Sequence, residues 1–266
     1  MVAYDPAKSR RFDMGRVIER TFGVFAANLP SFAAMSLLLV ALPAAAAGWL
    51  QMRIQSEALS GVASEFNFNS FGLLLAAGLV TWVTSLLLQA AVIHASVADL
   101  KGRQASIGES LGATAQKLLS LVGLSLLMAI GMALGLLLLI VPGILLMLAW
   151  MVAVPAMVVE RRDIFQSFER SAQLTRNNRG WLFVLGLVFV VVNWFVTMVV
   201  TALGMAVLVA VKGTDPQAIL WVNVLVTPLT SALSAVIGAA GVAAVYFELR
   251  SLKEGVGHAE LASVFD

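Results

Sequence analysis

The sequence contains no cysteine, only two histidines (His94 and His258) and few charged residues for its length of 266. Without cysteine the chain cannot form a disulfide, use a thiol as a nucleophile or bind a metal through thiolates. Two histidines are too few for a histidine-rich metal cluster. Charged residues make up 12% of the chain, against roughly 25% in soluble proteins, and hydrophobic residues make up 60%. This composition, with a mean hydropathy of +0.93, indicates a membrane protein.

The longest uncharged run extends from Leu118 to Val159. As one helix, at ~1.5 Å per residue, it would be about 63 Å long, roughly twice the ~30 Å hydrocarbon core of a bilayer. The run must therefore fold back on itself. Proline suits the first corner of a type II turn and glycine the second, so Pro142 and Gly143 are the candidate turn. We expect a transmembrane hairpin with helices over 118–140 and 144–159.

Further apolar segments have the length of membrane spans. They cover residues 31–50, 71–98, 181–211 and 217–247. Together with the hairpin they predict an all-α fold, a polytopic bundle of six transmembrane helices in a single domain. Residues 1–30 would form a cytoplasmic amphipathic segment, 31–247 the bundle and 248–266 a polar cytoplasmic tail. The polar stretch 51–70 predicts an exposed loop.

Short helices are predicted in front of the span pairs. Asp13 is a candidate N-cap, Ser106 and Glu109 have capping-box spacing, and Asp163 begins a similar pattern. In the first helix, apolar residues recur every three or four positions opposite the arginines, which predicts an amphipathic helix in the membrane interface. These apolar residues are Met14, Ile18, Phe22, Phe25 and Leu29. Packing on a partner protein is the alternative.

A weak repeat supports this organisation. The three matching patterns are Ile18-x-x-Thr21-Phe22, Ile107-x-x-Ser110-Leu111 and Ile164-x-x-Ser167-Phe168. Each lies in a predicted short helix before a pair of spans. The sequence therefore predicts three helix-plus-hairpin repeats, which either frame a site in the membrane or reflect duplication alone.

Two groups of residues resemble a known family. Leu139-Ile140-Val141-Pro142-Gly143-Ile144, with Trp150 and Pro155-Ala156, and Arg170-Ser171-x-x-Leu174-Thr175 are similar to the signature of the prokaryotic glycerophosphoryl diester phosphodiesterase membrane-domain family. The segment from Tyr246 to Gly255 is similar to the end of such chains. The resemblance implies a bacterial inner (plasma) membrane protein. It brings no catalytic residue, because the separate phosphodiesterase domain needs histidines with clustered carboxylates, and this chain has neither the room nor the set of histidines for it.

Polar side chains at helical spacing are the first candidate site. One stripe consists of Thr81, Ser85 and Gln89, a second of Asn193, Thr197 and Thr201, and a third includes Asn223 and Thr227. If Gln89, Asn193, Thr197, Asn223 and Thr227 converge, they could line a polar pathway or contact a lipid headgroup. Hydrogen bonding between helices is the alternative.

Arginines are the second candidate site. Arg161, Arg162, Arg170, Arg176 and Arg179 follow the hairpin closely, and such a cluster attracts anionic lipid or an acidic partner. An ordinary topology signal, with local ion pairing to Glu160, is the alternative.

These observations predict a non-enzymatic membrane protein that binds or organises lipid or a partner protein at the cytoplasmic face. A passive pathway for a small polar or lipid-like solute is the alternative function. The predicted spans contain no Asp, Glu, Lys or Arg, which argues against an ion-coupled transporter. Membrane lipids and either a protein partner or a second copy of the chain are the expected partners. No nucleic acid, cofactor or metal ion is expected, and the formal net charge is only +2.

Orientation is the first testable prediction. With both termini on one side, every lysine and arginine except Arg53 and Lys212 falls on that side, so both termini are predicted to be cytoplasmic. Reporter fusions at Glu57 and Asp215 should then report the outside, and fusions at Arg103, Asn178 and Asp266 the inside. An inside signal at Asp215 would contradict the six-span topology.

Overall fold

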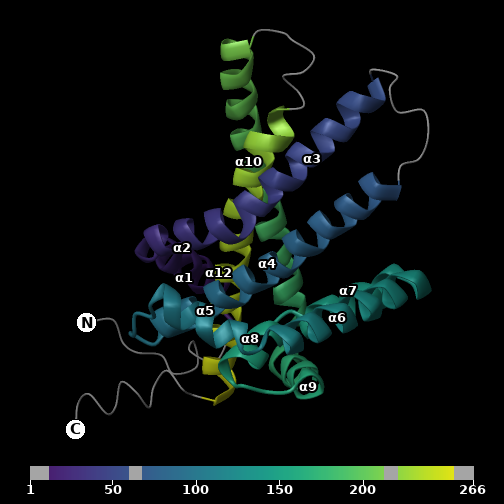
Figure 1. Cartoon of the computed structure of the whole chain (residues 1–266). Coiled ribbons are helices and arrows are strands. Elements are labelled where there is room, and N and C mark those ends of the chain that lie inside the picture. Colours follow the sequence, from purple (N-terminus) through teal and green to yellow (C-terminus); the bar gives the residue numbers. More distant parts are fainter. Residues whose placement is uncertain (1–11, 60–67, 213–220, 255–266) are drawn as a thin grey trace. The chain divides into compact units, whose positions relative to one another are not determined.

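A computed structural model of the protein describes residues 12–59, 68–212 and 221–254 (Figure 1). Within these ranges the secondary structure is helical and contains no strand. Six helical segments of this part are long and apolar enough to cross a membrane: Leu29–Glu57, Phe68–Leu100, Leu118–Leu138, Ile140–Val159, Arg179–Val211 and Val224–Glu254. The all-α, six-span prediction is confirmed, and the protein is an integral membrane protein.

The elements follow one another in a regular order. They are α1 (Met14–Ala27), α2 (Leu29–Ser36), the π-helical segment η2 (Leu37–Ala41), α3 (Leu42–Leu59), α4 (Phe68–Leu100), α5 (Ile107–Ala115), α6 (Leu118–Leu138), α7 (Ile140–Trp150), α8 (Ala153–Val159), α9 (Ile164–Thr175), α10 (Arg179–Lys212), η3 (Val222–Val226) and α12 (Thr227–Glu254). Each of the short helices α1, α5 and α9 precedes a pair of spans, in the order that the sequence predicts.

The repeated positions of the short helices share one environment. Thr21, Ser110 and Ser167 are all fully buried. The hydroxyls of Thr21 and Ser167 each donate to the backbone carbonyl four residues earlier, at 2.7 Å. A small hydroxyl residue can meet its own hydrogen-bond requirement in this way and still allow a neighbouring helix to approach closely. This common position supports the repeat.

The chain folds into two compact units. Of the described residues, the first unit contains 12–27, 90–188 and 237–254, and the second contains 28–89 and 189–236. The core of the first unit includes Leu121 and Leu124 from α6, Ala153 and Met157 from α8, and Ala90 from α4. In the second unit, α3 packs against η2 and η3.

The predicted hairpin forms in the first unit, where α6 and α7 lie side by side (Figure 1). Its turn, however, is Leu139 alone, with an extended backbone at φ −167° and ψ 148°. Pro142 and Gly143 lie in the first turn of α7, so the predicted type II turn at these residues is wrong. Proline fits the first turn of a helix because its missing N–H would have no intrahelical partner there. A Pro-Gly pair is therefore compatible with either structure.

Small residues let α6 and α7 approach each other. A Cβ atom on Gly143 would lie 2.6 Å from Leu136 Cδ2 and 2.9 Å from the Leu136 backbone nitrogen. A Cβ atom on Gly131 would lie 2.4 Å from the ring of Trp150. That ring also packs on Phe168 of α9, with centroids 4.6 Å apart. The absence of a side chain at Gly131 and Gly143 thus makes room for Trp150 and Leu136.

The returning span is broken between α7 and α8 by a side chain of α9. Ser171 Oγ donates to the Ala149 carbonyl at 2.7 Å and accepts from the Val152 N–H at 3.2 Å. Pro155 follows closely and has no N–H to continue the helical ladder. The hydroxyl therefore satisfies backbone groups at the break and holds α9 against it.

Two predicted boundaries differ from the structure. Helix α3 continues to Leu59, so the first part of the predicted loop 51–70 is helical, with an Arg53–Glu57 ion pair at 3.7 Å. Helix α12 continues to Glu254, so 248–254 is not part of a tail. The charged residues of 248–254 look solvated in the sequence. In the structure, ion pairs hold several of them against neighbouring helices.

A substitution at Gly143 tests the packing of the hairpin. We expect Gly143→Ala to lower the unfolding free energy by about 1–3 kcal/mol, because the new methyl group meets backbone as well as side-chain atoms. Thermal unfolding in lipid nanodiscs measures the effect. Gly186→Ala in α10 is the matched control, since no atom lies within 4 Å of its added Cβ. Equal stabilities of the two variants would contradict this packing.

Candidate functional site

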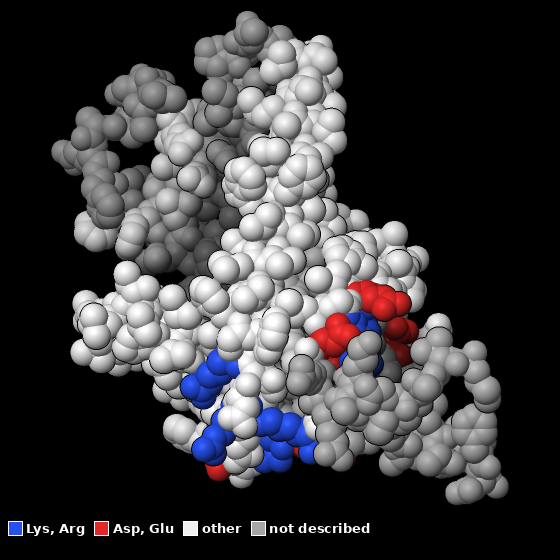
Figure 2. Space-filling model, turned by 180° about the vertical axis from the view of Figure 1, so that it is seen from behind, with Lys and Arg blue, Asp and Glu red and all other residues white. Residues whose placement is uncertain are grey.

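Charged side chains of the first unit gather near the ends of its helices, and Figure 2 shows lysine and arginine close to one another on one face. They form two arrangements with different chemistry. One is a network of ion pairs around Glu160 and Glu248. The other is a cavity lined by basic residues.

Glu160 is the centre of the ion-pair network. It follows α8 directly and its side chain is only 10% exposed. It accepts hydrogen bonds from Arg162 Nε at 2.6 Å, Arg170 Nε at 3.0 Å and Tyr246 Oη at 2.9 Å. Arg170 also binds Glu254, which pairs with Arg250 at 2.7 Å. Glu160 therefore links α8, α9 and α12.

Burial and hydrogen bonding act in opposite directions on Glu160. Desolvation raises the pKa of its carboxyl group, but the hydrogen bonds from Arg162, Arg170 and Tyr246 outweigh this and bring the pKa below its ordinary value of 4.5. Desolvation also opposes the charge of Arg170, yet its bonds to Glu254 and Glu160 raise the pKa of its guanidinium. These groups are consequently held in their charged forms.

Glu248 forms a second centre, between α12 and α1. Its side chain is completely buried, and Arg20 Nη1 lies 2.5 Å from Oε2. Arg16 Nη2 lies 3.6 Å from Oε1. Arg20 also lies over the ring of Phe247, 5.0 Å from its centroid. The N-terminal helix is thus tied to the last helix of the chain.

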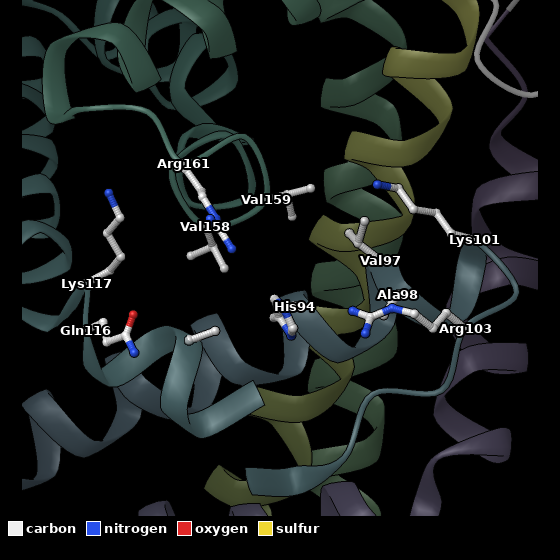
Figure 3. A pocket seen from close by; sticks show the side chains of 11 residues that line it. His94, Val97, Ala98, Lys101, Arg103, Gln116, Lys117, Val158, Val159 and Arg161 are labelled. Atoms are coloured by element: carbon white, nitrogen blue, oxygen red, sulfur yellow. The ribbon is translucent and has the colours of Figure 1, made fainter. Parts of the chain in front are cut away.

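The basic cavity lies between the end of α4, α5 and the end of α8. It has a volume of about 410 Å³. The four cations Lys101, Arg103, Lys117 and Arg161 line it, and so does His94 (Figure 3). An apolar wall is formed by Val97, Ala98, Val158 and Val159. No acidic residue of the described ranges lines the cavity.

Most of the positive charge in this cavity is uncompensated. Arg103 pairs with Glu109 at 2.7 Å, which lowers the pKa of that carboxyl. Lys101, Lys117 and Arg161 form no ion pair with the part of the chain that the structure describes. His94 Nδ1 lies 3.4 Å from Ser110 Oγ of α5. The arrangement suits an anionic ligand.

The arginines that the sequence groups together have different environments. Arg162 and Arg170 belong to the Glu160 network, so the local ion pairing considered for Glu160 is confirmed. Arg161 lines the basic cavity. Arg176 is exposed, and Arg179 is half-buried with an Nε atom that has no hydrogen-bond partner in the described ranges.

The sequence did not single out the remaining cations of the cavity. Lys101, Arg103 and Lys117 served there only to indicate orientation. Their one local signal is that they lie at the two ends of α5. Nothing in their spacing predicts that Arg161 meets them.

The polar stripes converge only in part. In the second unit, Thr81, Ser85 and Thr227 line a cavity of about 440 Å³. Thr81 and Ser85 donate to backbone carbonyls of their own helix, at 2.8 and 2.6 Å. Other members of the stripes have separate positions: Gln89 and Thr197 are half-buried, Asn193 is exposed, and the side chain of Asn223 lies outside the described part. Gln89, Asn193 and Thr197 do not line that cavity.

Comparison with known proteins adds one match. Residues 127–249 match the family model of a domain of unknown function (DUF7847). No curated protein and no solved structure matches the chain. The matched range contains Glu160, Arg170 and Tyr246, and it leaves out α1 to α5. Among the described residues, no group of three or more His, Asp or Glu could hold a metal ion.

Replacing Glu160 tests the ion-pair network. We expect Glu160→Gln to lower the unfolding free energy by about 2 kcal/mol at pH 7, because Arg170 loses a charged partner in a largely buried place. Glu169→Gln on the exposed side of α9 is the control. Thermal unfolding in nanodiscs measures both, and equal effects would contradict the role of Glu160.

The same network predicts a pH dependence. A carboxyl whose folded pKa is lowered contributes stability above its ordinary pKa of 4.5, and this contribution is lost as pH falls through the folded value. Wild-type protein should therefore lose more stability between pH 5 and the acid range than Glu160→Gln does.

Proposed function

We propose that the protein is a non-enzymatic membrane protein that binds anionic lipid at the cytoplasmic face of a bacterial inner membrane. The observation that carries this proposal is the basic cavity, in which four cations meet and no acidic residue of the described part takes part in the lining. Each lysine or arginine near an anionic membrane surface contributes about 1 kcal/mol of attraction.

The position of the cavity favours lipid over an acidic protein partner. Val97 and Ala98 belong to the last turns of the span Phe68–Leu100, and Val158 and Val159 end the span Ile140–Val159. Span ends lie near the boundary between hydrocarbon and headgroups. A ligand in this cavity would thus meet cations and an apolar wall together, as a lipid does at the boundary.

The distribution of charge supports the cytoplasmic side for the cavity. Cytoplasmic segments of inner-membrane proteins carry the excess of lysine and arginine, and the cavity cations lie in such segments. The resemblance to the glycerophosphoryl diester phosphodiesterase membrane-domain family, which we retain as a proposal, supports the same location.

The absence of enzymatic activity is also part of the proposal. A serine nucleophile needs a base within reach and an exposed hydroxyl. Ser110 lies near His94, but its side chain is completely buried and so is closed to a substrate. Glu109, Glu160, Glu248 and Glu254 are engaged by arginines, which disfavours them as general bases.

A passive pathway has weaker support. Thr81, Ser85 and Thr227 share a cavity in the second unit. The hydroxyls of Thr81 and Ser85 are already bonded to their own helix, so they offer mainly acceptor sites to a solute. We therefore prefer the binding role.

Two arginines provide a matched test. Arg161 and Arg176 are both exposed and form no ion pair with described residues, but only Arg161 lines the cavity. We expect Arg161→Gln to weaken binding of anionic lipid about fivefold, from ~1 kcal/mol per cation, and Arg176→Gln to leave it within twofold. Native mass spectrometry of protein released from nanodiscs of phosphatidylglycerol and phosphatidylcholine measures the retained lipid. Equal retention by both variants would contradict the proposed site.

A further inference from the structure

We infer that the basic cavity recognises a phosphate monoester at the end of a lipid headgroup. This inference rests on the proposed function and narrows it to one class of ligand. Four observations support the inference. They are the charge of the cavity, the positions of its cations on separate segments, the left-handed backbone conformation of Arg161 and the apolar wall.

The charge of the cavity exceeds that of a phosphodiester. Lys101, Lys117 and Arg161 have no acidic partner in the described part of the chain, and Arg103 has only Glu109. Three positive charges are therefore uncompensated. A phosphodiester headgroup supplies a single negative charge, whereas a phosphate monoester carries about −1.5 to −2 at pH 7. The monoester is the better electrostatic match.

The cations come from separate segments of the first unit. Lys101 and Arg103 follow α4, Lys117 lies between α5 and α6, and Arg161 follows α8. In Figure 3 they lie on different sides of His94. A terminal phosphate has three unesterified oxygens and can accept bonds from several directions, while a diester has only two. Arginine is suited to such oxygens because its guanidinium can bind two of them at once.

The backbone of Arg161 indicates that its side chain serves a purpose. Arg161 follows Glu160, the C-cap of α8, and has φ 55°, in the left-handed region. Helices commonly end with such a residue, and glycine is preferred there because it has no Cβ. Here a long basic residue takes the place of glycine, and its side chain lines the cavity. The presence of arginine at a position that favours glycine is explained if the guanidinium binds a ligand.

The apolar wall favours a lipid over free phosphate. The cavity has an apolar surface formed by Val97, Ala98, Val158 and Val159. Inorganic phosphate has no apolar group that could cover this surface. The glycerol and first methylene groups of a phospholipid would cover it. The volume of about 410 Å³ lies within the ~300–1,000 Å³ typical of small-molecule sites.

The experiment compares two anionic lipids on full-length protein. Nanodiscs contain phosphatidylcholine with equal amounts of phosphatidic acid, a monoester, and phosphatidylglycerol, a diester. Native mass spectrometry then measures which lipid stays bound. We expect phosphatidic acid to be retained at least tenfold more than phosphatidylglycerol, and 10 mM inorganic phosphate to displace little of it.

Arg161→Gly is the decisive variant, since it removes the guanidinium and relieves the backbone. We expect its melting temperature to equal or exceed that of the wild type while the preference for phosphatidic acid falls to about one. Arg176→Gly is unsuitable as a control because the backbone of Arg176 is not in the left-handed region. Arg176→Gln is used instead and should retain the preference for phosphatidic acid.

The outcomes separate this inference from the proposed function. Equal retention of both lipids by the wild type, with loss of both in Arg161→Gly, overturns the monoester inference and leaves anionic-lipid binding intact. Full displacement by inorganic phosphate overturns the lipid as the source of the phosphate group. Retention of neither lipid by the wild type overturns both proposals.

Discussion

Carboxylates that are buried where spans end must be paired, because an unpaired charge removed from water is strongly destabilising. Glu160 and Glu248 meet this requirement through arginines of α9 and α1. The pairs fix where the short helices lie. Helix α9 is held by Glu160 at the end of α8, and α1 by Glu248 near the end of α12. In the first repeat, the contact of His94 with Ser110 takes the corresponding place between α4 and α5.

Through these contacts, the short helix of each repeat is joined to the last helix of another repeat within the first unit. Helices α5 and α9 each contact the helix that precedes them in the chain, while α1 contacts the last helix. The Arg20–Glu248 pair therefore joins residues 228 positions apart and closes the series. Glu160 also accepts a hydrogen bond from Tyr246, 86 residues away. This bond connects the second repeat to the third. The network explains why α12 remains helical to Glu254.

Local patterns were sufficient to predict the spans and the short helices. Apolar length indicates a membrane span. Two of the predicted caps form: Asp13 accepts from the Arg16 N–H at 3.2 Å, and Ser106 from the Glu109 N–H at 3.1 Å. Asp163 does precede α9, but its side chain accepts no capping hydrogen bond. The turn at Leu139 was missed because leucine has no preference that would indicate a turn residue, while Pro-Gly is a common turn signal. The basic cavity was missed for a different reason. Its cations come from segments that are brought together by tertiary packing, and local sequence periodicity does not predict such packing.

The network and the cavity together divide the basic residues by role. Arginines that face a buried carboxylate already have an acidic partner, so they stabilise the fold and are less available to an anionic ligand. Lys101, Lys117 and Arg161 have no such partner among the described residues and repel one another, which disfavours the folded state unless an anion is bound. An anion that binds only the folded protein offsets this repulsion and stabilises it in proportion to the logarithm of its concentration. A cluster of this kind is therefore better explained by a ligand than by the stability of the fold.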